Sequence, residues 1–258
     1  MEFQGVETNL RESFRLVAAH RPAGELREME GVSIASAGVT FQMFNAAFLS
    51  APVDSETAMD RRVAQAAVHF AARNQRWAYW ICHGWLDNRT RRRLQSLLRK
   101  HNLYQAVELP GMLAGEVLPP ARGLPDIEVR RVSSGPVKEA FCAIGSLCFN
   151  VPLIWFCEVF DSDSIWNDFA AYVGYVNGEP VSTVATVIGG GAVGVYNVAT
   201  VPNHRRAGYG EAVMRHALEQ ARLQHGLSRS ILQSTPQGFE LYRRMGYRTV
   251  TSVAVFCS

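Results

Sequence analysis

The segment at residues 195–246 constrains the fold more than any other part of this chain, because it joins a strand pattern to a helix pattern through a short basic loop. An apolar, β-branched run from Gly194 to Val201 predicts a buried strand. A Pro-Asn-His turn and the sequence RRAGYG follow it. An amphipathic segment then predicts a helix, with its apolar positions at Val213, Met214, Ala217, Leu218 and Ala221. Strand, glycine loop and helix therefore follow in direct succession.

The loop between this strand and this helix has the composition of a phosphate-binding loop. Unpaired backbone N–H groups and the positive end of a helix meet there, which suits a phosphate or pyrophosphate. Gly208 and Gly210 leave room for a ligand, and Arg205 and Arg206 add positive charge. Taken alone, the pattern R-x-x-G-x-G fits a tight turn with solvated arginines equally well. It matches neither the P-loop pattern nor the dinucleotide-binding fingerprint.

The residues after the helix supply the context. A second strand is predicted at Ser230 to Ser234, and Pro236 starts a short helix that ends in LYRRMGY. This succession resembles motifs A and B of the GCN5-related N-acetyltransferase (GNAT) superfamily, and the resemblance extends over residues 126–258. It implies an α/β fold (α+β mixed) with a central mixed, mostly antiparallel sheet flanked by helices. It also implies an acetyltransferase that uses acetyl-CoA and needs no metal.

The resemblance assigns roles to individual positions. Tyr242 matches the tyrosine that protonates the CoA thiolate in many members. The strand lends its backbone to pantetheine, the loop holds the pyrophosphate, and the turn before the short helix adds hydrogen bonds. These cofactor positions are Val198, Ala199, Thr200, Arg205, Arg206, Ala207, Gly208, Tyr209, Gly210, Glu211, Ser234 and Thr235. Two of them depart from the family pattern. Arg206 stands where glycine is frequent, which the loop tolerates if the side chain points outward, and Thr235 replaces an asparagine and offers a single hydroxyl.

Length and composition set the remaining bounds. The 258 residues suggest two domains or one enlarged domain, and 48% apolar residues are enough for a sizeable core. The net charge of +3 does not call for nucleic acid. Five cysteines without C-x-x-C spacing indicate free thiols, with neither a disulfide framework nor a zinc site. No signal peptide or membrane span is evident, so we expect a soluble, cytoplasmic protein that is a monomer or a homodimer.

The sharpest boundary lies at the proline-rich sequence LPPARGLPDIEV. We expect residues 126–258 to form the catalytic GNAT domain and residues 1–120 to form a smaller, degenerate GNAT-like lobe, a tandem arrangement. The sequence LQSLLRKHNLYQAVELPGM echoes FELYRRMGYRTVTSVAVF in its helix–turn–strand layout. Between Leu49 and Ser55 the first half has no Arg-Gly loop. It should therefore not bind CoA in the same way, and we expect it to buttress the catalytic lobe and wall the acceptor cleft.

The acceptor is predicted to be a primary amine on a small molecule or peptide. In the segment VPLIWFCEVFDSDSIW, aromatic side chains offer apolar walls while Glu158, Asp161 and Asp163 offer negative charge. The same residues fit core packing and turn capping equally well. The strand that carries a carboxylate base in some relatives offers only Tyr196 and Asn197 here. Deprotonation through an ordered water that ends at Glu158 or Asp161 is our hypothesis, and the predicted catalytic set is Tyr242, Asn197 and Glu158.

Two alternatives stay open. A non-catalytic, acyl-CoA-binding regulatory protein would have the same loop. A tandem GNAT protein that takes its group from aminoacyl-tRNA would keep the fold, but the intact Arg-Gly loop argues against it. The arginine-rich helix at Arg89 to Asn102 is more readily explained as a solvated face than as a nucleic-acid contact, because no interleaved aromatics accompany it.

Overall fold

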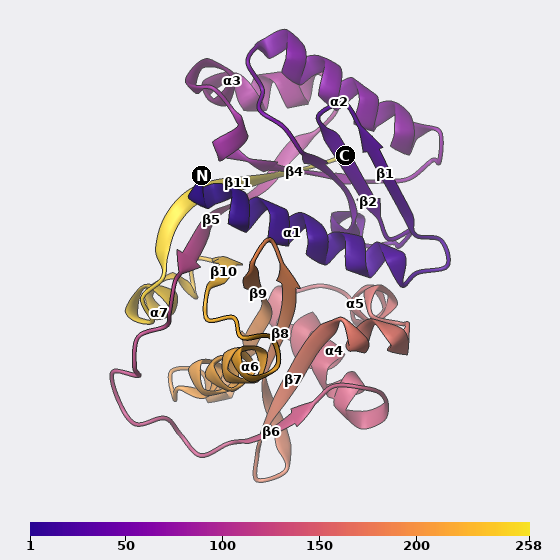
Figure 1. Ribbon diagram of the computed structural model, residues 1–258. Helices are drawn as coiled ribbons and strands as arrows, with labels where there is room; N and C mark the ends of the chain where they lie inside the picture. Colours follow the sequence, from indigo (N-terminus) through magenta and orange to yellow (C-terminus); the bar gives the residue numbers. More distant parts are fainter.

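Eleven strands form one mixed sheet in the computed structural model, which describes all 258 residues (Figure 1). Their order across the sheet is β1-β2-β3-β4-β11-β5-β10-β9-β8-β7-β6. Most neighbours are antiparallel, and the two parallel pairs are β3 with β4 and β9 with β10. The expected mixed, mostly antiparallel sheet flanked by helices is therefore confirmed.

The amino-terminal half contains three helices and five strands. They are α1 (Glu2–Ala19), β1 (Glu25–Met29), β2 (Val32–Ser36), β3 (Asn45–Leu49), α2 (Glu56–Ala71), β4 (Ala78–Cys82), α3 (Asn88–Arg99) and β5 (Tyr104–Ala114). Ser55 and Asp87 cap α2 and α3 by accepting hydrogen bonds from backbone N–H groups of the first turn. The helix–turn–strand layout predicted for the first half corresponds to α3 and β5, whereas α1 and β1 were not predicted.

The carboxy-terminal half contains the remaining elements. They are β6 (Glu128–Arg131), α4 (Gly135–Phe149), α5 (Leu153–Val159), β7 (Phe169–Val176), β8 (Glu179–Gly189), β9 (Ala192–Thr200), α6 (Tyr209–His225), β10 (Ser230–Gln233), α7 (Phe239–Arg244) and β11 (Arg248–Cys257). Asn177 and Gly178 both have positive φ and form the tight turn between β7 and β8. The predicted succession of strand, glycine loop, helix, second strand and short helix corresponds to β9, the loop, α6, β10 and α7.

The last strand of each half crosses into the other half. The carboxy-terminal strand β11 lies between β4 and β5, and β5 lies between β11 and β10. Their antiparallel register runs from Arg248 opposite Leu113 to Cys257 opposite Tyr104. The two helix–turn–strand units that echo each other in sequence, α3–β5 and α7–β11, thus exchange strands about the centre of the sheet. The division at residues 120–126 stays a prediction, and the sheet is continuous across it.

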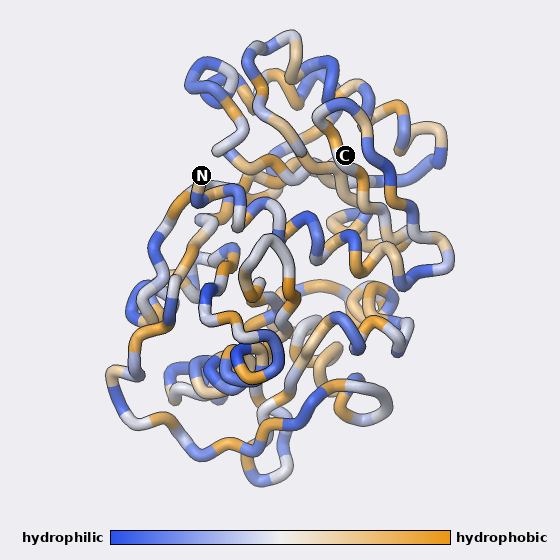
Figure 2. Tube along the Cα trace, in the orientation of Figure 1, coloured by the Kyte–Doolittle hydropathy of each residue, from blue (hydrophilic) through white to orange (hydrophobic).

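Alternating side chains of the central strands give the carboxy-terminal half two cores. Val184 of β8 packs in the cluster beneath α6, and the next residue, Ala185, packs in the cluster beneath α4 and α5. Helix α6 therefore covers one face of the sheet, and α4 and α5 cover the opposite face. The helices in Figure 2 alternate between apolar and polar along their length, as amphipathic helices should. None of the helices has the length and apolar character that crossing a membrane would require.

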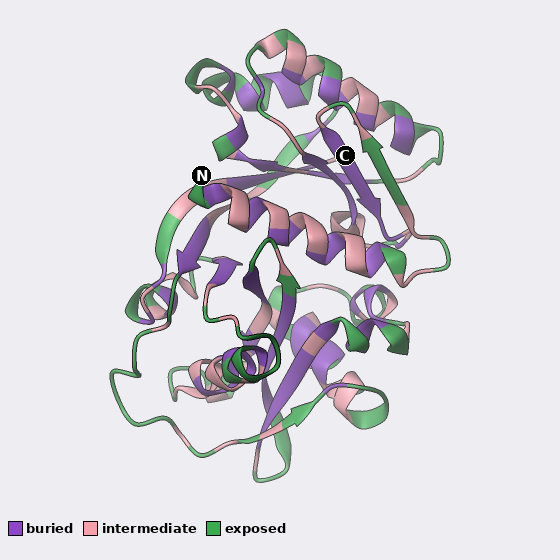
Figure 3. Cartoon of the chain, viewed as in Figure 1, coloured by how far each residue is buried: buried purple, intermediate pink, exposed green.

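Helix α1 lies between the two halves and touches strands of both (Figures 1 and 3). Leu10 and Phe14 pack on β2, β3 and β11, whereas Val6 packs against Leu113 and Ile231 of β5 and β10. Phe3, Val6, Leu10, Phe14 and Val17 are buried at helical spacing. The same spacing is present in the sequence and could have indicated this helix.

Candidate functional site

Strands β9 and β10 separate soon after they begin. They pair in parallel only at Val193 with Ser230 and Gly194 with Ile231. Beyond these pairs β10 continues along β5, while β9 keeps only β8 as its neighbour. The β9 edge that faces β10 therefore has no strand partner after Gly194. Val198, Ala199 and Thr200, which the family resemblance assigns to pantetheine, lie along the separated part.

A β-bulge lies where the strands part. Thr183 pairs with Ala199 and Ala185 pairs with Tyr196, so that two residues of β9 oppose Val184 alone. One of the two is Asn197, whose φ is 51°, a left-handed conformation that asparagine tolerates better than most residues. Thr183 Oγ1 fixes the bulge by donating a 2.8 Å hydrogen bond to the Asn197 carbonyl. A bulge of this kind bends its strand locally, and this one lies beside the gap.

The glycine loop lies at the end of β9 and at the start of α6. Gly208 is the residue before α6 and has a φ of 95°, which favours glycine. A Cβ at Gly210 would lie 3.0 Å from Thr200 Oγ1, so this position has little room for a side chain. Arg205 Nε donates a 3.0 Å hydrogen bond to the Thr200 carbonyl, which ties the loop to the strand. The expected strand, loop and helix are thus present with the glycines at the close contacts.

The charges of the loop are unbalanced. Arg205 and Arg206 are exposed and no carboxylate forms an ion pair with either. Glu211 in the first turn of α6 is already paired with Arg215 at 2.8 Å. Ala207 is exposed, and Tyr209 is half-buried with its ring 5.9 Å from His204. The loop therefore presents positive charge and backbone N–H groups to solvent.

Tyr242 lies on α7 and packs in the core beneath α6 with 7% of its surface exposed. Burial alone raises the pKa of its hydroxyl well above the ordinary value, and no protein group hydrogen-bonds it. By contrast, Tyr247, whose ring lies 6.0 Å away, shares a 2.6 Å hydrogen bond with Ser230. Tyr242 is thus protonated at neutral pH and has its hydrogen-bond donor free.

The turn between β10 and α7 is held by its backbone. Ser234 is buried, its N–H donates to the Pro110 carbonyl at 2.9 Å, and its hydroxyl donates to the Thr235 carbonyl at 2.8 Å. The same carbonyl accepts the N–H groups of Gly238 and Phe239. Thr235 itself is exposed. Its hydroxyl forms no hydrogen bond within the protein and is free for a ligand.

The acidic residues predicted near the acceptor are engaged with other protein groups. Glu158 Oε2 accepts a 2.9 Å hydrogen bond from the Thr40 N–H of the amino-terminal half. Asp161 Oδ2 forms an ion pair with Arg21 Nη1 at 3.6 Å, and Asp163 Oδ1 forms one with Lys138 Nζ at 2.7 Å. Phe156 and Trp166 are buried in the core beneath α4 and α5, whereas Trp155 is more exposed and stacks on Phe41. The aromatic residues thus pack mainly as core, and the role of Glu158 as a base stays a prediction.

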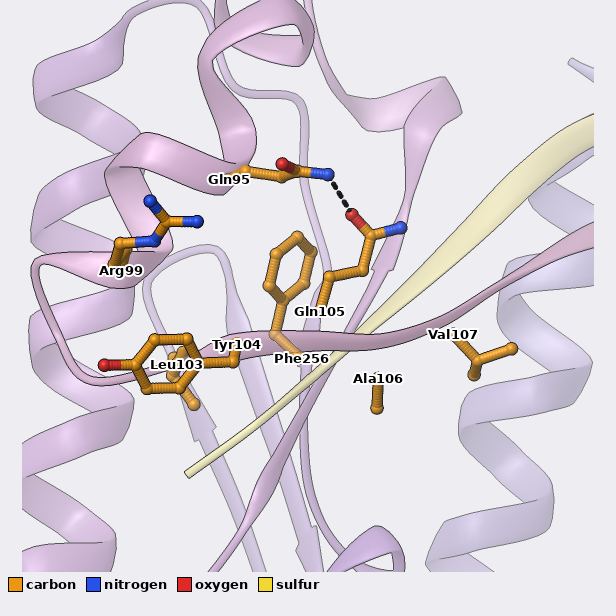
Figure 4. Close-up of a pocket in the computed structure, with 8 residues that line it drawn as sticks. All are labelled: Gln95, Arg99, Leu103, Tyr104, Gln105, Ala106, Val107 and Phe256. Carbon is orange, nitrogen blue, oxygen red and sulfur yellow. Dashed lines mark hydrogen bonds between the residues drawn. The ribbon is translucent and has the colours of Figure 1, made fainter.

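The corresponding region of the amino-terminal half is closed. Past the parallel pairing of β3 and β4, an isolated bridge joins Val53 to Leu86, and the Val53 N–H donates to the Trp85 carbonyl at 2.7 Å. Trp85 is itself buried. This half does contain a hollow of about 380 Å³ between α3 and β5, lined by Gln95, Arg99, Tyr104 and Phe256 among others (Figure 4). It lies on other strands and has no glycine loop.

A family model described as an acetyltransferase (GNAT) domain matches residues 167–249, the stretch that contains the splayed strands, the loop and Tyr242. The carboxy-terminal half contains a GNAT domain. The protein is accordingly an enzyme of the acyltransferase class. A search of curated proteins gave no match.

Solved structures share the fold of the whole chain as well as that of the GNAT domain. A GCN5-related N-acetyltransferase from Kribbella flavida is 18% identical with a TM-score of 0.72, covering 96% of this chain and 94% of its own. A putative GNAT-family acetyltransferase from Novosphingobium aromaticivorans is 10% identical with a TM-score of 0.59, covering 98% and 97%. A tandem GNAT protein from the clavulanic acid biosynthesis pathway is 10% identical with a TM-score of 0.55, covering 98% and 92%. At these identities the likeness concerns the fold alone.

Proposed function

We propose that this enzyme transfers the acetyl group of acetyl-CoA to a primary amine within a ternary complex. The observation that carries the proposal is the gap between β9 and β10, which opens after Gly194 and extends past the Asn197 bulge toward the glycine loop. One domain thus combines a free strand edge for an amide-rich ligand, a cationic loop for its phosphates and a hydroxyl donor on Tyr242.

The residues present fit acetyl-CoA. Gly208 and Gly210 leave the loop open where side chains would crowd it, and the exposed Arg205 and Arg206 lack carboxylate partners. Pantetheine carries amide groups, which the unpaired edge of β9 near Val198 to Thr200 can hydrogen-bond in the manner of an added strand. Acetyl-CoA supplies an activated thioester when bound.

Orientation supplies much of the rate in this mechanism. The enzyme holds amine and thioester together, so that their reaction becomes effectively unimolecular. The amine nitrogen forms the new C–N bond, the C–S bond breaks, and the amine proton leaves to solvent. An amine with an ordinary pKa of about 10 must first lose a proton, and an ordered water is our proposed route for it. A backbone N–H of the splayed strand polarises the thioester oxygen.

Tyr242 stabilises the departing thiolate. An ordinary thiol has a pKa of about 8.5, whereas burial raises the pKa of the Tyr242 hydroxyl above the usual tyrosine value of about 10. Complete proton transfer from Tyr242 to the thiolate would therefore be uphill. A hydrogen bond that Tyr242 donates to the developing negative charge has no such cost. We therefore assign Tyr242 the role of hydrogen-bond donor, with the final proton coming from solvent.

The decisive experiment combines binding and turnover. Calorimetric titration with acetyl-CoA should give one site per chain, and acetyl-CoA with pooled primary amines should release free thiol and yield acetylated products by mass spectrometry. Gly208→Glu should abolish both binding and turnover by placing a bulky anion in the loop. Gly226→Glu is the matched control, because Gly226 has a similar positive φ at the opposite end of α6 and should keep binding. Binding without thiol release would instead favour the non-catalytic regulatory protein.

A further inference from the structure

The linker between the two halves runs past the glycine loop of the GNAT domain. It comprises residues 115–127, which join β5 to β6. The Leu118 N–H donates a 2.9 Å hydrogen bond to the Met245 carbonyl at the end of α7. Farther along, a Cβ at Gly208 would lie 3.1 Å from Pro125 Cδ. The linker is therefore fixed at both the end of α7 and the start of α6.

Arg122 of this linker reaches the loop itself. Its Nη2 donates a 3.0 Å hydrogen bond to the Arg206 carbonyl and lies 3.8 Å from the position of a Cβ at Gly208. Arg206 has a φ of 66°, so the bond holds a residue in a left-handed conformation. A guanidinium has five N–H donors, and this contact uses one. Arg122 is exposed and has no carboxylate partner, so its other donors have no protein acceptor.

Arg122 thus adds a third arginine to a loop that already contains Arg205 and Arg206. Arg205 is fixed by the Thr200 carbonyl, Arg122 is fixed by the Arg206 carbonyl, and neither bond neutralises a charge. Like charges held together without a counterion repel one another, which is unfavourable in the free protein. An anion with several phosphate oxygens would relieve this repulsion and use the remaining N–H donors.

We propose that Arg122 is a third cationic residue of the phosphate site and directly binds a phosphate group of acetyl-CoA, either the pyrophosphate or the 3′-phosphate. The inference rests on the proposed function and extends it, because the residue lies in the linker outside the stretch matched by the GNAT family model.

The test compares Arg122→Gln with Arg130→Gln, a matched exposed arginine that instead pairs with Glu128. Affinities for acetyl-CoA and for 3′-dephospho-acetyl-CoA are measured by calorimetry at low and high salt. Arg122→Gln should weaken acetyl-CoA binding about tenfold or more, the effect of losing a charge-assisted hydrogen bond. Arg130→Gln should bind like the parent. If Arg122 contacts the 3′-phosphate, Arg122→Gln should bind acetyl-CoA and 3′-dephospho-acetyl-CoA with the same affinity. If it contacts the pyrophosphate, the substitution should weaken the affinity for both ligands by the same factor.

The salt dependence of the affinity distinguishes direct phosphate binding by Arg122 from a role in which Arg122 only supports the Arg206 backbone. A lost phosphate contact makes binding less sensitive to ionic strength, whereas a loosened loop weakens binding without changing that sensitivity. Arg122→Lys keeps the charge and should retain part of the affinity. The proposal is wrong if Arg122→Gln, with an unchanged melting temperature, binds acetyl-CoA within twofold of the parent or keeps the parent's salt dependence. If acetyl-CoA does not bind the parent protein at all, the proposed function fails first.

Discussion

The Tyr196 hydroxyl donates a 2.6 Å hydrogen bond to Asn9 Oδ1, which joins the first helix of the chain to β9 one residue before the bulge. Asn9 is fully buried, and its Nδ2 lies within 3.1 Å of the carbonyls of Val187, Gly189 and Ala192. A single amide therefore fixes the β8–β9 turn against α1. Helix α1 covers β9 on the face opposite α6 and holds the strand that opens at the candidate site.

Asn9→Ala should destabilise the protein and disturb catalysis together. It leaves the Tyr196 hydroxyl and the carbonyls without partners in a buried site, which we expect to cost about 2–4 kcal/mol of the free energy of unfolding. Denaturant unfolding measures this change, and kcat with acetyl-CoA reports on the bulge. Asn167→Ala, an exposed site, is the control and should change neither. A variant as stable as the parent would show that α1 contributes packing alone.

The exchanged strands predict that neither half folds alone. A fragment of residues 1–118 would lack β11, which separates β4 from β5 at the centre of its sheet. A fragment of residues 126–258 would lack β5, which pairs with both β10 and β11. Circular dichroism and amide exchange should show each fragment largely unfolded, while mixing the two should restore structure. A cooperatively folded isolated half would contradict this.

The sequence predicted local elements well, because their patterns are local. The run of β9 depends on consecutive β-branched residues and the apolar stripe of α6 on residues three or four apart, and the glycine loop stands between them. The exchange of β5 and β11 leaves no such mark, since a strand pattern does not specify which strands will flank it. The repeated helix–turn–strand layout indicated two related units, but it did not indicate that their strands pair with each other.

One site residue and the surroundings of two predicted ones were not anticipated. Arg122 lies in a proline-rich linker without periodicity, and only its three-dimensional contact with the Arg206 carbonyl marks it. The left-handed Asn197 was detectable in principle, because asparagine inside a β-branched strand is a signal for a bulge. The surroundings of Glu158 were not detectable, since its partner Thr40 lies in the other half of the chain.

His69 makes stability fall as the solution becomes acidic. Its ring lies between α2 and β1, both ring nitrogens are buried without hydrogen bonds, and Glu25 is 3.6 Å from Nε2. Burial, with Arg73 as a further cause, lowers the pKa of His69 below its ordinary value of about 6.5. As pH falls, His69 is therefore protonated in the unfolded chain before it is protonated in the folded protein. The free energy of unfolding consequently decreases below about pH 6.5.

His69→Leu should reduce this loss. The variant removes a buried group without partners, so its free energy of unfolding at pH 8 should stay close to that of the parent. Between pH 6.5 and pH 5 it should decline less steeply, as urea unfolding at several pH values would show. His225→Leu removes an exposed imidazole and should keep the parent's pH dependence. If the free energy of unfolding of His69→Leu falls with pH as steeply as that of the parent, the effect belongs to other groups. His83 and His216 are candidates, because burial also lowers their pKa values.

Tyr242→Phe should keep cofactor affinity and slow the chemical step. The substitution removes one hydroxyl that has no protein partner, so packing and the free energy of unfolding should change little. The departing thiolate loses a hydrogen bond to a charged atom, which corresponds to a decrease in kcat of roughly 10- to 100-fold. Single-turnover measurements isolate this step. Because burial raises the pKa of Tyr242, its hydroxyl stays protonated up to about pH 10, and the decrease should be the same at every pH from 6 to 9.

Tyr247→Phe provides the matched comparison, because it removes the other hydroxyl of the same aromatic pair. That hydroxyl hydrogen-bonds Ser230 in the core, so its loss should lower the free energy of unfolding by about 1 kcal/mol while the chemical step stays at the parent rate. The two variants thus have opposite signatures, one in catalysis and one in stability. If Tyr242→Phe instead lowers stability and keeps the parent's single-turnover rate, Tyr242 belongs to the core and the thiolate leaves with the help of water alone.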